Sequence, residues 1–556
     1  MDNRRMFLLA ALGLVGYLIF SAWMQDYAPA PRAQSPQQTA AANPAAPSSS
    51  AIPAPAVPAA AAGTTDGASS KVVGAAPLAH GQDVEVTTDT MRVILDTAGG
   101  DVRKTWLLQY PQTQEEGSPP VELLTPEPSH RLVLQTGLRG LTAAGQPPVF
   151  SAPASNYSLD SGQDVVRVPL TWRHNGVTVT KIYTFHRGNY QVDLEYRITN
   201  ASGQPLKIAP YAQFRSHYVP QSHSLFSLSR YMYTGPAIFN GEDYNKLNYD
   251  DLAEKPFSVT TAGGWTSMVS QYFLAAVIPP PATPAHYYAE QITGKRYRSG
   301  LVLPEVTVAP GAHAELAQRL FLGPKLQDRL AEVAPGLGRT VDYGKVTIIA
   351  QPMFKVLEWI HWAIGNWGWS IILLVFLIKL VFFPLQQKAG RSMAKMREFQ
   401  PRIKAIQERY KDDKQRLSQA MMELYKKEKI NPMGGCLPVL LQLPIYFGLY
   451  YVLLYSVELR QAPFIFWLTD LSAPDPYYVL PILYGIAQFV QMRVQPQPAD
   501  KMQARIMMVM PLGAVAFAII MPAGLVVYWV ANAVLTALQQ WHINKSLHEP
   551  KKRDKR

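Results

Sequence analysis

Cysteine is almost absent from this chain of 556 residues, which contains one, at position 436. A single cysteine excludes an intrachain disulfide framework, a cysteine-ligated zinc site and an iron–sulfur cluster. Charged residues are also scarce, at 17% of the composition, whereas apolar residues make up 48%. The position of the few charges therefore decides among the remaining classes of protein.

The positive charge is distributed unevenly. The chain carries 52 Lys and Arg against 40 Asp and Glu, a net charge of +12. Residues 24–345 hold 25 basic and 26 acidic side chains, so the excess lies outside that segment, beside long apolar runs. Such clusters are typical of the cytoplasmic loops of membrane proteins. A nucleic-acid-binding domain would place them on a polar, aqueous fold, so we expect no direct nucleic-acid partner.

Six apolar segments are candidate membrane spans, because about 20 residues are needed to cross a hydrocarbon core of roughly 30 Å. They are residues 6–24, 366–385, 437–457, 477–492, 506–521 and 525–541. The first is either a signal peptide or an anchor, and Pro31 after the nearby Ala-x-Ala favours a retained anchor. With a cytoplasmic N-terminus, every strongly basic loop falls on the cytoplasmic side and residues 24–365 lie outside.

The region between the first two spans changes character. Residues 28–79 are dominated by Ala, Pro, Ser and Thr and predict an extended linker. Short alternating runs that predict the strands of an all-β sandwich follow at 84–86, 91–95, 165–172, 177–185, 190–199, 273–278 and 301–308. His174, His186, His217 and His223 are scattered through this region without metal-ligand spacing, so we expect no metal.

The predicted fold class is a polytopic α-helical membrane protein, with an N-terminal anchor and a five-helix core, that carries a large all-β sandwich. The predicted parts are an anchor (1–27), a Pro/Ala-rich linker (28–80), the sandwich (81–340), an amphipathic helix in the membrane interface (341–365), a core helix (366–385), a cytoplasmic helical hairpin (386–436), four core helices (437–545) and a basic tail (546–556). Three core spans reach only about 24 Å. Either the whole membrane is thin there, or a thinned patch lowers the barrier to polar groups.

One charged residue lies inside a predicted span. Lys379 is part of SIILLVFLIKLVFFP (370–384), where an unpaired cation is unfavourable by about 2.5–3.5 kcal/mol. No Asp or Glu occurs inside the predicted spans, so two alternatives remain. The lysine either reaches about 10 Å to the cytoplasmic boundary, or lines a hydrated recess open to the cytoplasm.

Polar side chains on other spans favour the recess. They are Gln442, Tyr446, Tyr450, Tyr451, Gln488, Gln491, Tyr528, Asn532, Thr536 and Gln539. Each one alone could bond to a neighbouring helix, but together with an unpaired cation they suit a wet cavity. The lack of acids in the spans argues against a proton-coupled pump.

The segment 388–429 carries 13 basic and 6 acidic residues. Apolar residues at helical spacing over 393–406 and 417–425, with a turn at Asp412-Asp413, predict a helical hairpin. It either contacts anionic lipids or docks a ribosome, a targeting factor or an emerging apolar segment. The candidate docking residues are Met393, Met396, Arg397, Arg402 and Lys404.

Six short motifs resemble those of the YidC membrane-protein insertase family in its Gram-negative form. They are NWGWS (366–370), SMAKM (392–396), DDKQR (412–416), NPMGGC (431–436), VELRQAP (457–463) and DPYY (475–478). The resemblance extends to the order of anchor, linker, large outer domain and five-helix core.

The resemblance implies a function. Family members insert and fold inner-membrane proteins, alone or with the Sec translocon, without nucleotide, metal or other cofactor, so we expect no enzyme activity. Their core helices enclose a hydrated, positively charged groove that is closed outward and open to the cytoplasm and the lipid. The implied substrates are nascent inner-membrane proteins, and the implied location is the bacterial inner membrane, with both termini cytoplasmic and the outer domain periplasmic. That domain is a β-supersandwich in the family, resembles sugar-binding folds and contacts Sec partners.

The resemblance also assigns groove residues. The family's groove cation is usually arginine and falls on Lys379, where lysine keeps the charge but not the bidentate geometry. A threonine that contacts substrate falls on Val375 and a tyrosine falls on Trp529, so this groove wall is more apolar. The candidate substrate contacts are Val375, Gln442, Tyr446, Phe517, Tyr528 and Trp529.

Two other classes of function are compatible with parts of the chain. A secondary solute transporter would show inverted repeats or paired broken helices, and neither is evident. A membrane-tethered periplasmic carbohydrate protein would use carboxylates of the outer domain, where many pairs are available.

Overall fold

The computed structural model describes residues 80–142, 146–219, 232–411, 413–428, 437–494 and 501–548. The predicted anchor, the linker up to residue 79 and the tail from residue 549 lie outside the described residues. The chain divides into two compact units, and the described part of the smaller unit is 401–411 with 413–428.

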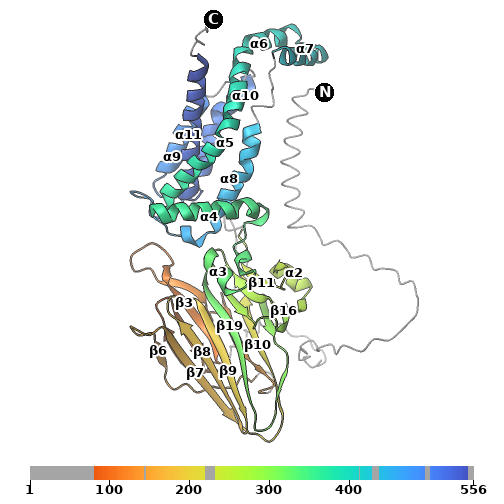
Figure 1. The fold of residues 1–556 in the computed structure, drawn as a ribbon, viewed down its shortest axis with the longest axis vertical. Coiled ribbons are helices and arrows are strands. Elements are labelled where there is room, and N and C mark those ends of the chain that lie inside the picture. Colours follow the sequence, from red (N-terminus) through yellow and green to blue (C-terminus); the bar gives the residue numbers. More distant parts are fainter. Residues whose placement is uncertain are drawn as a thin grey trace, which may run out of the picture. The chain divides into compact units, whose positions relative to one another are not determined.

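The predicted all-β domain consists of two sheets (Figure 1). In the described residues the first sheet has eleven strands, in the order β13-β16-β17-β10-β5-β3-β2-β1-β6, with β18 paired to β10 and β4 to β3. Their bounds are β1 Asp83–Thr87, β2 Met91–Asp96, β3 Asp101–Pro111, β4 Pro120–Leu124, β5 Leu132–Arg139, β6 Asn156–Ser158, β10 Leu206–His217, β13 Phe257–Ala262, β16 Pro284–Thr293, β17 Arg296–Val302 and β18 Val306–Val308. The strands pair antiparallel, apart from β1 with β6.

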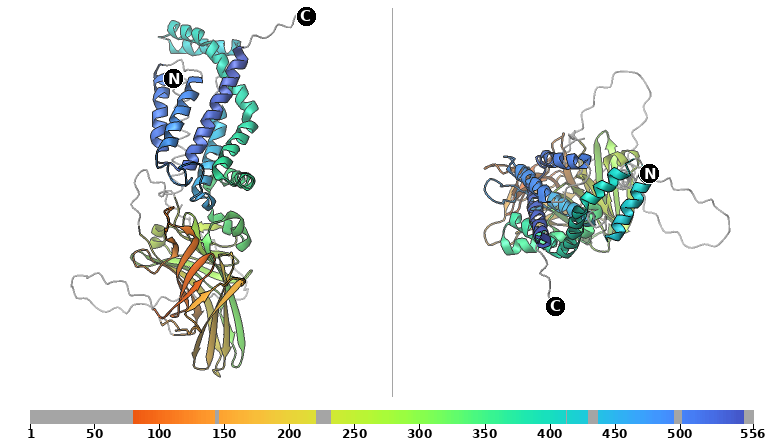
Figure 2. Two further views of the ribbon diagram at one scale, coloured as in Figure 1. Left: turned by 90° about the vertical axis from the view of Figure 1, so that its left-hand side faces the viewer. Right: turned by 90° about the horizontal axis from the view of Figure 1, so that it is seen from above.

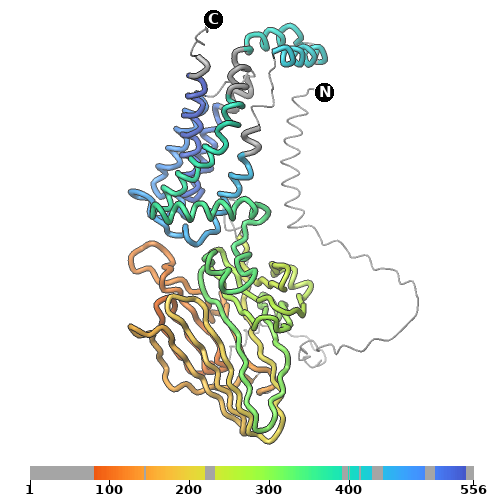
Figure 3. The backbone as a smooth tube through the Cα atoms, in the orientation of Figure 1, coloured from red at the N-terminus to blue at the C-terminus, as the bar shows by residue number. Residues whose placement is uncertain are grey.

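The second sheet has eight strands in the order β12-β11-β14-β15-β19-β9-β8-β7. Their bounds are β7 Val165–His174, β8 Val177–His186, β9 Gln191–Asn200, β11 Gly235–Phe239, β12 Tyr244–Lys246, β14 Trp265–Val269, β15 Phe273–Ile278 and β19 His313–Pro324. Figure 3, in the orientation of Figure 1, traces the long neighbouring strands β7, β8 and β9.

Alternating burial explains why these strands form a sandwich. Along β10, Ile208, Ala212 and Phe214 lie in the core, whereas Tyr211 and Gln213 are partly exposed. A sheet with one buried face shows this period of two. The segment predicted as one strand at 301–308 is split into β17 and β18, and Pro304 lies in the gap, where it has no N–H to donate to a ladder.

A buried cation links the two sheets. Lys181 on β8 is fully buried. Its Nζ donates to the carbonyl oxygens of Gly99 (3.0 Å), Gly100 (2.6 Å) and Thr136 (2.8 Å), on β5 and the β2–β3 turn. Three acceptors satisfy the three donors of an ammonium group, so the charge is solvated by backbone dipoles.

The C-terminal part is a helical bundle (Figures 1 and 2). Its helices are α5 Trp367–Glu398, α8 Leu437–Tyr455, α9 Val479–Val494, α10 Lys501–Ala518 and α11 Ala523–His548. Helix α11 packs against α5 and α9, and α10 packs against α9. Two stretches, Trp367–Gly390 and Ala523–Lys545, are long and apolar enough to cross a membrane, and shorter apolar helices occur at Val479–Val494 and Met508–Ala518.

Helix α4 (Thr347–Ile364) crosses the end of this bundle and packs on α5 and α8 (Figure 1). Phe354, Leu357 and Ile360 are buried, as their helical spacing predicts. Trp359 and Trp362 are 67% and 83% exposed. The helix therefore presents aromatic side chains away from the bundle. The sandwich is joined to α4 through α3 (Gln327–Val333), η2 (Leu337–Thr340) and η3 (Gly344–Val346), and α2 (Tyr249–Glu254) precedes β13.

Several helix ends differ from the predicted boundaries. The predicted break at residue 385 lies inside α5, because Gln, Lys, Ala, Arg and Met residues favour helix after Pro384. The predicted first hairpin helix is interrupted at Phe399, and α6 (Gln400–Arg409) begins with Pro401 in its first turn, where proline is tolerated. The predicted tail begins within the last turn of α11.

Two of the motifs lie at the ends of the helices that face the sandwich, which we call the outer ends. Asn366 accepts a hydrogen bond from the Trp369 N–H (3.1 Å) at the start of α5 and donates to the Phe464 carbonyl (3.0 Å). A Cβ atom at Gly368 would collide with the Phe464 ring. Asp475 is buried just before α9. Its carboxylate accepts hydrogen bonds from the Leu480 N–H (2.7 Å), the Trp467 Nε1–H and the Tyr477 N–H. We call these loops, 456–478, together with the turn before α11, the outer rim.

The turn between α10 and α11 is bonded to the same loop. The Ala523 N–H donates to the Ala473 carbonyl (2.7 Å), and the Gly524 N–H donates to the Leu471 carbonyl (2.8 Å). These main-chain bonds join the two outer connections of the helices to each other.

The sandwich contacts the outer rim through polar side chains. Arg460 Nη2 donates to the carbonyl oxygens of Pro111 (2.7 Å) and Gln112 (3.2 Å), and Gln461 Nε2 donates to Pro111 (3.1 Å). Gln271 Nε2 donates to the Leu454 carbonyl (3.0 Å) at the end of α8. The outer domain is therefore held against the ends of the core helices.

Glu458 lies within this junction, and its burial makes the stability of the protein depend on pH. Its Oε1 accepts the Gln327 N–H (3.3 Å), and its Oε2 is buried without a partner among the described residues. Burial, with smaller effects from Glu358 and Asp328, raises the pKa of Glu458 from 4.5 to about 7. The folded state therefore holds a proton that the unfolded state releases between these values, and stability falls as pH rises through that window.

We expect Glu458→Gln to raise the stability of the full-length protein at pH 8 by up to about 3 kcal/mol, and to leave it nearly unchanged at pH 4. Thermal unfolding in detergent at the two pH values measures the difference. Glu332→Gln, at an exposed position on α3, is the matched control. An equal shift for Glu458→Gln at both pH values would contradict the prediction.

Candidate functional site

Lys379 is positioned by an apolar helix. In α5, residues 371–383 other than Lys379 are Ile, Leu, Val or Phe. The helix bonds the backbone groups of this stretch internally, as a lipid environment requires. Lys379 is 8% exposed. It lies on the side of α5 that faces α11, whereas Leu380 and Val381 on the same turn are exposed.

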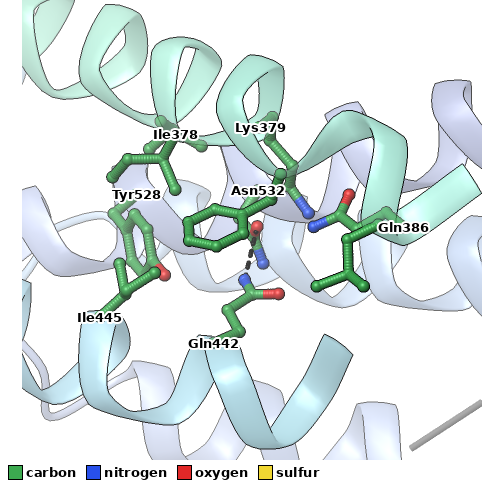
Figure 4. A pocket seen from close by; sticks show the side chains of 10 residues that line it. Ile378, Lys379, Gln386, Gln442, Ile445, Tyr528 and Asn532 are labelled. Carbon is green, nitrogen blue, oxygen red and sulfur yellow. Dashed lines mark hydrogen bonds between the residues drawn. The ribbon is translucent and has the colours of Figure 1, made fainter. Parts of the chain in front are cut away.

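Three polar residues of α11 share the face toward Lys379. Tyr528, Asn532 and Thr536 follow one another at intervals of four, which places them on one side of a helix. Lys379 Nζ donates to Thr536 Oγ1 (2.8 Å), and this hydroxyl donates to the Asn532 carbonyl (2.6 Å). Gln442 Nε2 on α8 donates to Asn532 Oδ1 (2.9 Å), as Figure 4 shows. A polar network thus joins α5, α8 and α11 inside the bundle.

A cavity of about 20 Å³ lies beside this network. Its lining residues are Val375, Ile378, Lys379, Phe382, Leu385, Gln386, Gln442, Ile445, Tyr528 and Asn532. Such a volume accommodates about one water molecule. The side chains of Lys379, Gln386, Gln442 and Asn532 converge on it, whereas Ile378 and Ile445 supply apolar walls (Figure 4).

The charge of Lys379 has no carboxylate partner in the described part of the chain. No Asp or Glu oxygen lies within 4 Å of its Nζ, and the hydroxyl of Thr536 accepts its hydrogen bond. The sequence left two alternatives for Lys379, a reach to the cytoplasmic boundary and a position in a hydrated recess. In the structure the ammonium group is bonded to α11 within the bundle. The cavity beside it has room for about one water molecule.

The predicted substrate contacts fall into two groups. Val375, Gln442 and Tyr528 line the cavity. Tyr446, Phe517 and Trp529 instead form an aromatic cluster beside it, in which the Trp529 ring stacks on Tyr446 (6.1 Å between centroids) and on Phe517 (5.8 Å). Phe517 is half exposed and Trp529 is buried. The cluster joins α8, α10 and α11.

The predicted docking residues of the hairpin lie on two helices. Met393, Met396 and Arg397 belong to the last turns of α5, and Arg402 and Lys404 lie exposed on α6. In the smaller unit, α7 (Lys414–Lys427) begins at Asp413, whose Oδ1 accepts the Arg416 N–H (3.0 Å).

Asn532 and Thr536 were not among the predicted site residues, although their polarity was evident. The interval of four from Tyr528 through Asn532 to Thr536 is the signal that places them on one face. In the described residues, no group of three or more His, Cys, Asp or Glu side chains could hold a metal ion.

Two family models match this chain. The model described as "YidC periplasmic domain" covers residues 83–356, and the model described as "60Kd inner membrane protein" covers residues 359–551. Among solved structures, one described as "Active YidC insertase crystal structure with the first transmembrane domain resolved" covers 84% of this chain and 93% of its own, with 16% identity and a TM-score of 0.38.

Full-length relatives have the same description. A protein of Nitrosococcus oceani named "Membrane protein insertase YidC" is 44% identical over 99% of this chain and 100% of its own length. A protein of Stutzerimonas stutzeri with this name is 40% identical, over 98% of this chain and 99% of its own. Together with the match of both family models, this identity confirms the predicted relationship. The chain belongs to the YidC family of membrane protein insertases.

Proposed function

We propose that this protein inserts nascent inner-membrane proteins by drawing the polar end of a substrate helix toward Lys379. The observation that carries the proposal is an ammonium group inside an apolar bundle, bonded to Thr536 without a carboxylate partner among the described residues. A fixed cation in a medium of low dielectric attracts substrate carboxylates more strongly than it would in water. The role is one of binding and guidance, without a covalent step.

The small size of the cavity means that helices must separate before a substrate can enter. About 20 Å³ holds a water molecule and no peptide segment, so a substrate enters when α5 and its neighbours separate. A substrate helix gains transfer free energy from its apolar residues, and the membrane potential then acts on its acidic outer tail at about 2.3 kcal/mol per charge per 100 mV. The exposed apolar faces of α5 and α9 offer the exit to lipid.

The proposed topology has both termini in the cytoplasm and the sandwich in the periplasm. It is supported by the clustering of basic residues beside alternate ends of the spans. Helix α4, with Trp359 and Trp362 exposed, suits the membrane interface, where such rings concentrate. The basic hairpin would meet anionic lipids, the ribosome or targeting factors, and the Sec translocon would be a partner on some substrates.

Site-specific photocrosslinking tests the proposal. We expect a photoreactive residue at Val375, Gln442 or Tyr528 to crosslink to the span of a ribosome-bound substrate during insertion, because these positions line the cavity. The control is Leu512 on α10, which is 74% exposed and lies away from the cavity lining. Crosslinks that were no stronger at the three cavity positions than at Leu512 would contradict the proposal.

A further inference from the structure

The outer face of the eleven-stranded sheet carries a group of arginines that the insertion mechanism does not use. Arg215 on β10 is paired with Arg298 on β17, and two residues along, His217 is paired with Arg296. Pairs two residues apart lie on the same face of a sheet. Phe214 and Ser216, which alternate with them, are buried, so Arg215, Arg296 and Arg298 face outward.

Arg131 extends the group at the start of β5. Its carbonyl oxygen accepts the His217 N–H at 2.8 Å, which places Arg131 beside the end of β10. His130 and Lys295 are exposed in the same region, and both act electrostatically on His217. We call Arg131, Arg215 and Arg296 the arginine cluster.

In the described part of the chain, the cluster makes no ion pair with a carboxylate. Arg298 is bonded to Glu290, with Nη2 2.6 Å from Oε1. Among the described residues, by contrast, no Asp or Glu oxygen lies within 4 Å of the guanidinium groups of the cluster. Because residues 24–345 have a net charge of −1, the cluster is a local concentration and does not reflect a basic domain.

The three guanidinium groups repel one another. Burial lowers the pKa of Arg215, Arg131, Arg298 and Arg296 lower it further, and Asp101 acts in the opposite direction. Like charges held together on a partly buried face destabilise the free protein, and a bound anion relieves this repulsion. Arginine forks bind carboxylates through paired, charge-assisted hydrogen bonds.

Polar groups continue from the cluster along the same face. Tyr288 Oη donates to Gln213 Oε1 (2.8 Å), and Gln213 Nε2 donates to Gln135 Oε1 (3.0 Å). Gln213 is the residue two positions before Arg215 on β10, so its amide lies next to the guanidinium on that face. Gln135 Nε2 in turn donates to Asp101 Oδ2 (3.0 Å). These polar groups are bonded to one another, so the recognition of a peptide on this face rests on the cations of the cluster.

We propose that the arginine cluster binds acidic segments of substrate proteins after they emerge on the outer side of the membrane. The inference rests on the proposed function, which delivers acidic outer tails to this side. An extended peptide fits the position better than a membrane surface does. β10 is an interior strand of the sheet and Arg215 is only partly exposed, so a flexible chain reaches it more readily than a flat bilayer.

Equilibrium binding to the full-length protein in detergent tests the inference. The probe is a short fluorescent peptide of alternating Glu and Ser, and its neutral counterpart has Gln in place of Glu. We expect the double variant Arg215→Gln/Arg296→Gln to bind the acidic peptide about tenfold more weakly, and wild-type binding to weaken as salt is added. Arg215→Lys, which keeps the charge but not the paired hydrogen bonds, should weaken binding less than Arg215→Gln does.

The matched control is Arg167→Gln, at an exposed position on β7 of the other sheet, which makes the same change in charge per site and should bind like the wild type. Unchanged binding by a double variant that melts like the wild type would overturn the inference. Stronger competition by glycerol phosphate than by the acidic peptide would assign the cluster to lipid headgroups and also overturn it. This assay does not depend on insertion, so a negative result would not contradict the crosslinking result at the cavity. Peptide binding can likewise be measured even if crosslinking fails.

Discussion

Replacing Lys379 with methionine is expected to slow the insertion of a single-span substrate with an acidic tail by at least about tenfold, which corresponds to 1.4 kcal/mol. The reason is the loss of a cation inside the bundle. A carboxylate about 5 Å from an ammonium group gains about 3 kcal/mol at an effective dielectric constant of 20. Methionine keeps most of the length of the side chain and removes the charge. Protease protection of the tail in proteoliposomes measures the rate.

Three comparisons isolate the charge. Lys379→Arg should retain insertion, because the guanidinium remains charged. Lys388→Met removes an exposed cation from the same helix and should have little effect. Lys379→Met should not change the insertion rate of a substrate that has Asn and Gln in place of its tail carboxylates. If the acidic substrate inserted at the same rate into wild-type and Lys379→Met proteoliposomes, the charge would have no part in the mechanism.

Replacing Lys181 with methionine is expected to destabilise the sandwich by about 3–5 kcal/mol. The change removes the Nζ donor from the carbonyl oxygens of Gly99 and Thr136, and leaves the Gly100 carbonyl with the Tyr183 hydroxyl as its donor. It also leaves Asp101 without the cation that acts on it electrostatically. For a domain of this size the melting temperature should fall by about 10 °C.

Thermal unfolding of the full-length protein, followed by circular dichroism of its strands, measures the loss. Lys207→Met is the control, because Lys207 is exposed on β10 and its nearest carboxylate, Glu305, is 3.9 Å away at the surface. A melting temperature of Lys181→Met within 2–3 °C of the wild type, which is about 1 kcal/mol, would show that the three bonds contribute little.

The sequence predicted the elements whose pattern is strong. The apolar runs coincide with α5, α8, α9, α10 and α11, because a membrane helix needs a long stretch with few charges. Strands with clear alternation, such as β8 and β9, were also predicted. Many other strands were missed, among them β3, β5, β10, β16 and β19. In β10 and β19, Pro210, Lys207 and Arg319 interrupt the apolar pattern, and tertiary packing decides the structure.

The site was predicted in part. Lys379 was evident because a charge inside an apolar run is costly wherever it lies. Its partner Thr536 lies 157 residues further along the chain, and no local pattern specifies which helix faces which. The volume of the cavity depends on how Ile378, Phe382 and Ile445 pack together, which composition alone does not specify.

The bonds of the outer rim determine where the bundle can widen. Ala523 and Gly524 are bonded to Ala473 and Leu471, and Arg460 holds the same loop to the sandwich. These bonds hold the outer ends of α8, α9, α10 and α11 together. Any splaying that admits a substrate must pivot about this end. The largest displacement then falls at the opposite ends, which the proposed topology places in the cytoplasm. The access path is thus wedge-shaped, and a substrate meets the tightest constriction last.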